Sequence, residues 1–113
     1  MEQNAGHDSI LNLDRVVGDV AGSICNALMN SPVVGQNQFV LLPAITFKVK
    51  ACLLRSQNNG GWRDLLRQAE VAKDIRAAIV PLMWAFEFPF DVIYKLGPEI
   101  EQSAYAALIK SVR

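Results

Sequence analysis

Hydrophobic residues recur near the start of the chain at steps of three and four. They fall at Ile10, Leu13, Val17, Val20, Ala21, Ile24 and Leu28. This spacing places all of them on one stripe of an α-helix. Asp8 or Ser9 can cap its N-terminus by accepting from free backbone N–H groups. Pro32 cannot continue a helix, so we expect the helix to end near Asn30. Residues 1–8 are predicted to form a flexible tail.

The next apolar segment, residues 39–55, carries two periodicities. Read as a strand, it alternates apolar and polar side chains from Ile45 to Ala51. Read as a helix, it presents two apolar rows, formed by Ala44, Phe47, Ala51 and Leu54 and by Ile45, Val49 and Cys52. Pro43 suits the first turn of a helix, and the sequence NNGG after Gln57 provides a C-terminal stop. We therefore predict a helix from Pro43 to Arg55.

A third helix is predicted over residues 62–80. Its apolar face comprises Trp62, Leu65, Leu66, Ala69, Ala72, Ile79 and Val80. Arg76 falls within this stripe, where its aliphatic stem can cover the core while its guanidinium reaches water. Pro81 is expected to kink this helix or to start a new one.

Residues 77–94 hold only two charged side chains and are rich in aromatic residues. We predict two short helices that meet near Phe88–Pro89, because Pro89 lacks the N–H that a central strand must donate. Gly97–Pro98 is typical of a helix end followed by a helix start, and small residues beyond it predict a closing helix.

Together these elements predict a single all-α domain over residues 9–113, built as a compact bundle of about five helices. The alternative is an α+β domain with a short hairpin formed by residues 44–52 and 84–94.

Composition narrows the classes of partner. Hydrophobic residues make up 51% of the 113 residues, charged residues 19%, and the net charge is zero. Nucleic-acid binding is not expected, because it normally requires an excess of basic residues. Membrane insertion is not expected either, because prolines and acidic residues interrupt residues 77–94. The polar N-terminus lacks the features of a secretory signal, and Cys25 and Cys52 are expected to be reduced thiols. A cytoplasmic location follows, although the sequence leaves a Cys25–Cys52 bridge open.

Residues with catalytic potential are few. Glu87 and Asp91 are four apart and lie among aromatic residues that can raise a carboxyl pKa. We favour instead a rim position for Glu87 and a place at a helix start for Asp91. His7 falls in the predicted tail, so no zinc site of known spacing can be assembled with Cys25 and Cys52. We expect no cofactor, no metal site and a non-enzymatic role, and an enzyme that uses Glu87 and Asp91 stays open as an alternative.

Two features suggest contact surfaces. Gly18 and Gly22 form a GxxxG pattern on the first helix, which lets another helix of this chain or of a neighbour approach closely. The chain also has more apolar side chains than a domain of this size encloses, so we expect self-association or binding to another protein. The predicted interface comprises Trp84, Phe88, Phe90, Tyr94, Tyr105 and Ile109.

The sequence therefore predicts a small protein–protein interaction module, acting as an adaptor, assembly component or regulator, that forms homo-oligomers. The alternative is a helical module that binds a small apolar ligand or lipid with the same aromatic side chains.

Overall fold

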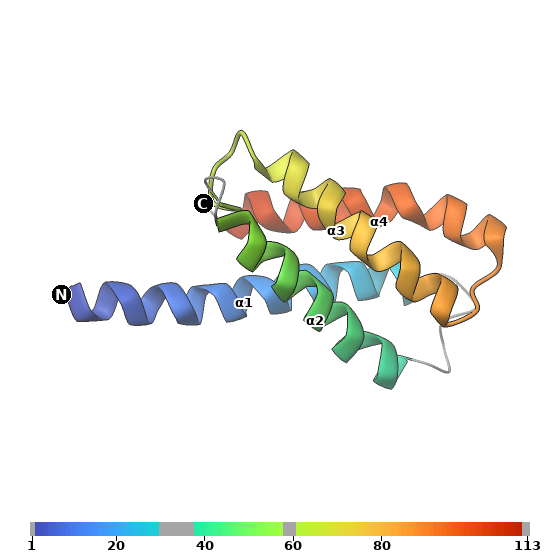
Figure 1. Ribbon diagram of the computed structural model, residues 1–113, viewed down its shortest axis with the longest axis horizontal. Coiled ribbons are helices and arrows are strands. Elements are labelled where there is room, and N and C mark those ends of the chain that lie inside the picture. Colours follow the sequence, from blue (N-terminus) through green and yellow to red (C-terminus); the bar gives the residue numbers. More distant parts are fainter. Residues whose placement is uncertain (1, 30–37, 58–60, 112–113) are drawn as a thin grey trace.

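The computed structural model describes the backbone of residues 2–29, 38–57 and 61–111, and the side chains of residues 13–28, 40–57 and 61–111. Within these residues the chain forms the helices α1 (Glu2–Met29), α2 (Gln38–Ser56), α3 (Gln68–Ala85) and α4 (Phe90–Ser111) (Figure 1). The all-α prediction is confirmed. The described residues contain no strand, so the alternative hairpin of residues 44–52 and 84–94 is wrong.

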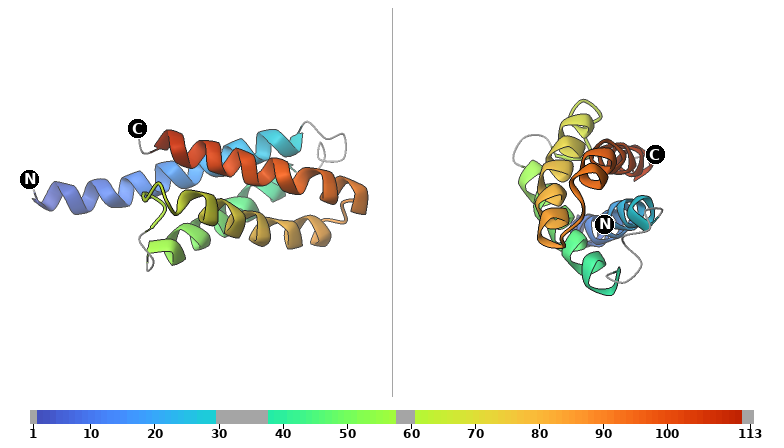
Figure 2. Two further views of the ribbon diagram at one scale, coloured as in Figure 1. Left: turned by 90° about the horizontal axis from the view of Figure 1, so that it is seen from above. Right: turned by 90° about the vertical axis from the view of Figure 1, so that its right-hand side faces the viewer.

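Successive helices run in opposite directions and form two layers. One layer contains α1 and α4, and the second contains α2 and α3, which cross the first layer obliquely (Figures 1 and 2). Each helix packs against two others: α1 and α3 both contact α2 and α4. The outward side of the α2–α3 layer is therefore one broad face of the bundle.

The first helix matches its predicted apolar stripe but is longer than expected. Its backbone is helical from Glu2, so residues 2–8 belong to the helix rather than to the predicted tail, and Asp8 and Ser9 lie inside it. It ends at Met29, next to the predicted end at Asn30. Every member of the predicted stripe from Leu13 onward is buried, whereas the side chain of Ile10 lies outside the described residues.

The described residues form four helices rather than about five, because α3 and α4 run through prolines at which breaks were predicted. Pro43 also lies inside a helix, since α2 begins at Gln38 rather than at the predicted Pro43. Pro81 is part of α3, and α4 continues through Gly97–Pro98 without a break. A proline removes the hydrogen bond to the carbonyl four residues earlier. For Pro81 and Pro98 those carbonyls belong to Ala77 and Tyr94, both of which are exposed residues. The predicted junction near Phe88–Pro89 is confirmed, since α3 ends at Ala85 and α4 begins at Phe90.

The segment before α3 is not helical. Residues 62–67 form turns, in which the backbone N–H of Leu66 donates to Asp64 Oδ1 at 3.0 Å. Trp62 is buried as predicted, but Leu65 and Leu66 are exposed, Leu66 by 90%. Their predicted place on a helical apolar face is therefore wrong. The hydrogen bond between the Asp64 side chain and the backbone N–H two residues later favours a turn over a helix.

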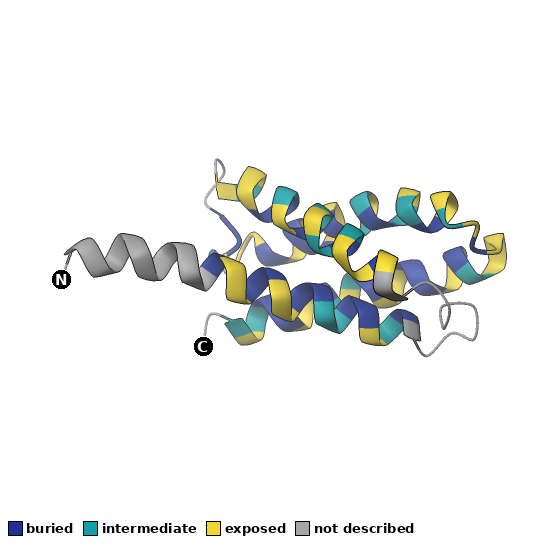
Figure 3. Cartoon of the chain, turned by 90° about the horizontal axis from the view of Figure 1, so that it is seen from below, coloured by how far each residue is buried: buried dark blue, intermediate teal, exposed yellow. Residues whose placement is uncertain are grey.

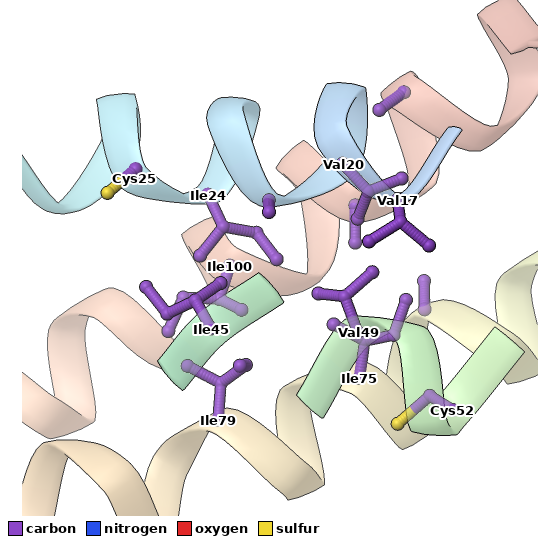
Figure 4. Close-up of a cluster of buried hydrophobic side chains, with 14 of the residues drawn as sticks. Val17, Val20, Ile24, Cys25, Ile45, Val49, Cys52, Ile75, Ile79 and Ile100 are labelled. Carbon is purple, nitrogen blue, oxygen red and sulfur yellow. The ribbon is translucent and has the colours of Figure 1, made fainter. Parts of the chain in front are cut away.

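The core lies between the two layers. Figure 4 shows isoleucine and valine side chains from all four helices pointing toward one another, among them Ile24, Ile45, Ile75 and Ile100. Each of these four is completely buried. Figure 3 shows the same division along each helix, with buried positions turned inward and exposed positions turned outward.

Among the residues whose side chains are described, one polar side chain is buried within the core. Gln68, the first residue of α3, donates from Nε2 to the carbonyl of Trp62 and to the carbonyl of Leu108, both at 3.1 Å. It therefore ties the turn before α3 to the C-terminal part of α4. A buried amide donor with two acceptors is satisfied, so Gln68 fixes how these segments fit together.

Candidate interaction surface

The six residues of the predicted interface lie in different environments. Trp84, Phe90, Tyr94 and Tyr105 are exposed, and Ile109 is half-buried. Phe88 is only 4% exposed and belongs to the core, so its assignment to a surface is corrected. The alternation of Phe86, Phe88 and Phe90 in the sequence gives no sign of this difference, which arises from the turn between α3 and α4.

That turn is a Schellman motif that ends α3. The N–H of Phe88 donates to the carbonyl of Met83 at 3.0 Å, and the N–H of Glu87 donates to the carbonyl of Trp84 at 3.0 Å. Glu87 takes the left-handed conformation, with φ of 62°, at the position where glycine is usual. Phe88 and Met83 are both buried, as expected for the hydrophobic contact of this motif. The motif turns Phe88 into the core and leaves Trp84 outside.

Three exposed aromatic rings gather around this turn. The ring centroids of Trp84 and Phe90 are 5.9 Å apart, and those of Phe90 and Tyr94 are 6.4 Å apart. We call Trp84, Phe90 and Tyr94 the aromatic corner. These three predicted residues are brought together by the structure, whereas Tyr105 and Ile109 lie farther along α4. Phe90 and Tyr94 are 67% and 79% exposed, so contact with each other leaves most of their surface in water.

The aromatic corner lies at one end of a groove between α3 and α4. The groove is lined by Lys73, Arg76, Ala77, Val80, Pro81, Trp84 and Glu101. Arg76 Nη1 lies 3.2 Å from Glu101 Oε1 across the two helices. The Arg76 guanidinium passes over Gly97, where an added Cβ would lie 3.1 Å from two of its nitrogens. Gly97 thus leaves room for the ion pair that crosses the groove.

A second exposed apolar surface lies on α2 and was missed by sequence reasoning. Phe47 is 71% exposed, and Val40 and Leu54, seven residues to either side, are exposed as well. With Pro43 and Ala51 they form what we call the α2 stripe. The predicted two apolar rows are both present, but only the row of Ile45, Val49 and Cys52 faces the core. The signal was available in the spacing, because residues seven apart recur on one side of a helix.

The α2 stripe and the aromatic corner are connected across α3. A second groove, between α2 and α3, is lined by Phe47, Lys48, Ala51, Arg55, Ser56, Asp74, Ala77, Ala78 and Pro81. Ala77 and Pro81 therefore line both grooves. We call the α2 stripe, Ala77, Pro81 and the aromatic corner together the apolar band. It runs from α2 across α3 to the start of α4.

The charges at the two ends of the band differ in sign. The helix α2 contains Lys48, Lys50 and Arg55 and no acidic residue. At the other end, Glu87 lies in the turn between Trp84 and Phe90, and Asp91 follows Phe90 directly. Both carboxylates are exposed and neither takes part in an ion pair with another described residue. The α2 end is therefore basic and the corner acidic.

The other residues with catalytic potential are not brought together. Glu87 lies in the exposed turn, and Asp91 is in the first turn of α4, where the helix dipole favours a negative charge. His7 lies outside the described side chains. Among the described residues no cluster of three or more His, Cys, Asp or Glu could hold a metal ion. None of the helices in the described part of the chain has the length and apolarity needed to cross a bilayer.

The two cysteines are separate free thiols. Cys25 on α1 and Cys52 on α2 are both buried and unbridged (Figure 4). Burial raises the pKa of the Cys25 thiol, because the thiolate would lose its hydration. Cys52 Sγ accepts a hydrogen bond from Arg55 Nη2 at 3.4 Å. The thiols therefore pack as small hydrophobic groups in the core.

The GxxxG pattern of α1 does not serve packing within the described chain. A Cβ added at Gly18 or at Gly22 would meet no atom within 4 Å. No described helix thus approaches closely at these glycines. The prediction that they allow close approach of another helix is therefore wrong for the described part of this chain, and contact with a neighbouring chain stays a prediction.

The sequence and the structure were compared with known protein families, curated proteins and solved structures, and none of them matches. The candidate surface therefore rests on its own geometry.

Proposed function

We propose that this protein is a small protein–protein interaction module that self-associates through the apolar band and has no enzymatic role. The supporting observation is the continuity of the band across α2, α3 and α4. Single exposed hydrophobic residues are ordinary on protein surfaces, whereas a contiguous apolar surface of this extent is typical of binding sites. An adaptor, an assembly component or a small regulator would use such a surface.

The composition of the band supports protein partners in particular. Aromatic side chains dominate interface energetics when a partner removes them from water, and three of them meet at the aromatic corner. The zero net charge also favours association, because little electrostatic repulsion separates the copies. We further propose a cytoplasmic location, which is supported by two free thiols in the structure.

Sedimentation equilibrium of the wild type and of Phe90→Ser tests this proposal. We expect the wild type to associate, and we expect Phe90→Ser to raise the dissociation constant by about 30-fold, the loss of one aromatic anchor. Leu66→Ser is the matched control, because Leu66 is 90% exposed but lies outside the band. We expect it to leave association unchanged.

Two results would contradict the proposal. One is a wild type that stays monomeric up to millimolar concentration. If this monomer also gains melting temperature with fatty ligands, the band serves instead as a site for a small apolar ligand, with the α3–α4 groove as its location. The other is an equal rise of the dissociation constant in Phe90→Ser and Leu66→Ser, which would show that association does not depend on the band.

A further inference from the structure

The two ends of the apolar band carry complementary charges. At the α2 end, Lys48 and Arg55 line the groove beside Phe47, with Asp74 as the carboxylate opposite them. At the corner, Glu87 and Asp91 adjoin Phe90, with Lys95 as the nearby cation in sequence. The α2 end thus has two cations and one carboxylate, whereas the aromatic corner has two carboxylates and one cation.

These charges disfavour contact between like ends. If the α2 stripes of two copies packed against each other, Lys48 and Arg55 would face the same residues of the second copy. If two corners met, Glu87 and Asp91 would face each other. Like charges opposed in an interface cost binding free energy, whereas opposite charges strengthen binding and set the orientation. The favourable contact joins the α2 stripe of one copy to the aromatic corner of another.

We infer that a second copy of this chain covers the apolar band in a closed two-fold dimer, with the α2 stripe of each copy on the aromatic corner of the other. This inference rests on the proposed self-association and adds its geometry. Ala77 and Pro81 of α3 line the groove at each end, so the two ends adjoin across α3. A two-fold axis passing near these residues exchanges the two ends, so both contacts form at once and the assembly closes.

The face is large enough for this role. Two helices of about 20 residues lying side by side present a face of roughly 30 by 20 Å. A standard protein–protein interface buries roughly 800 Å² of accessible surface on each partner. A dimer that covers the apolar band is therefore of ordinary interface size (Figure 2 shows α2 and α3 in one layer, with α4 beside α3).

Charge reversal of each end, followed by mixing, tests this geometry. The first variant, Lys48→Glu with Arg55→Glu, makes the α2 end acidic, and the second, Glu87→Lys with Asp91→Lys, makes the corner basic. We expect each variant alone to dimerise about tenfold more weakly than the wild type at low salt. An equimolar mixture of the two variants restores opposite charges at both contacts, so we expect its dimer affinity to return to that of the wild type.

The control variant reverses exposed charges outside the band, Glu99→Lys with Lys110→Glu, and is expected to keep wild-type affinity. Circular dichroism melting of each variant checks that it folds. A mixture no tighter than its components would overturn the inference. So would a first variant that pairs with the wild type more tightly than either does with itself, since that result indicates contact between like ends. A mass that grows beyond the dimer with concentration would overturn the closed geometry.

These outcomes separate the two proposals. A monomeric wild type contradicts self-association itself. If the wild type associates but mixing the two charge-reversed variants does not restore dimer affinity, only the pairing of unlike ends is contradicted.

Discussion

The helices α1 and α2 pack in the same bundle but differ in how their apolar residues are distributed. α1 has one apolar stripe, which is buried, and its outward side carries polar residues such as Asp14 and Asp19. α2 is apolar on two opposite sides, and only the side with Ile45 and Val49 is buried. A helix with one stripe is completed by its own bundle, whereas a helix with two stripes needs a further partner. The contrast therefore separates residues that stabilise the fold from residues available for binding.

The strongest test of this contrast replaces one residue from each side of α2. Ile45→Ala removes a completely buried side chain and leaves a cavity, so we expect the free energy of unfolding to fall by about 2–5 kcal/mol. Phe47→Ala removes a larger side chain from an exposed position, so we expect a change within about 0.5 kcal/mol. Urea unfolding at a concentration where the protein is monomeric measures both. Equal losses would show that Phe47 is a core residue.

Buried and exposed polar residues should differ in the same way, with a smaller loss of the free energy of unfolding. Gln68→Ala leaves the carbonyls of Trp62 and Leu108 without this donor in a buried place, so we expect a loss of about 1–3 kcal/mol. Gln102 is exposed, and Gln102→Ala serves as the matched control with a change within about 0.5 kcal/mol. Thermal and urea unfolding of the pair give the difference. A neutral Gln68→Ala would contradict the role of Gln68 in joining α3 to α4.

The outward side of α1 can be probed with Gly18→Ala and Gly22→Ala. Because a Cβ meets no atom within 4 Å at either position, each change should stabilise the helix, by about 0.5–1 kcal/mol. Urea unfolding measures the gain in the free energy of unfolding. If these glycines instead allow a helix of a neighbouring chain to pack against α1, alanine will weaken association, which sedimentation measures, and the band will not be the sole contact surface.

The smallest expected effect concerns the turn that builds the aromatic corner. Glu87 has a positive φ, so Glu87→Gly removes backbone strain and should raise the free energy of unfolding by up to about 1 kcal/mol. Glu87→Ala removes the same carboxylate but keeps the strain, so it is the control and should give no gain. Equal effects of the two variants in urea unfolding would show that the conformation of Glu87 is not strained.

The sequence predicts helices well where a single periodicity is present. The stripe of α1 and the junction near Pro89 were both predicted from local patterns, and the structure has both. The number of helices could not be obtained in this way. Prolines usually end helices, but α3 continues through Pro81 and α4 through Pro98.

The candidate surface was predicted only in part, for related reasons. Trp84, Phe90 and Tyr94 were named from their aromatic character, but Phe88 shares that character and is buried. Which of them faces outward depends on the left-handed conformation of Glu87, and sequence patterns favour glycine at such a position. On α2, two apolar rows compete for the core, and the choice between Ile45 and Phe47 depends on the helices packed against it.

Isotope-filtered NMR on an equimolar mixture of labelled and unlabelled protein tests the pairing of unlike ends most directly, because it detects contacts between copies only. We expect intermolecular contacts from the ring of Phe47 to the rings of Phe90 and Tyr94. Intermolecular contacts between Phe47 and Phe47, or contacts confined to residues outside the apolar band, would contradict it.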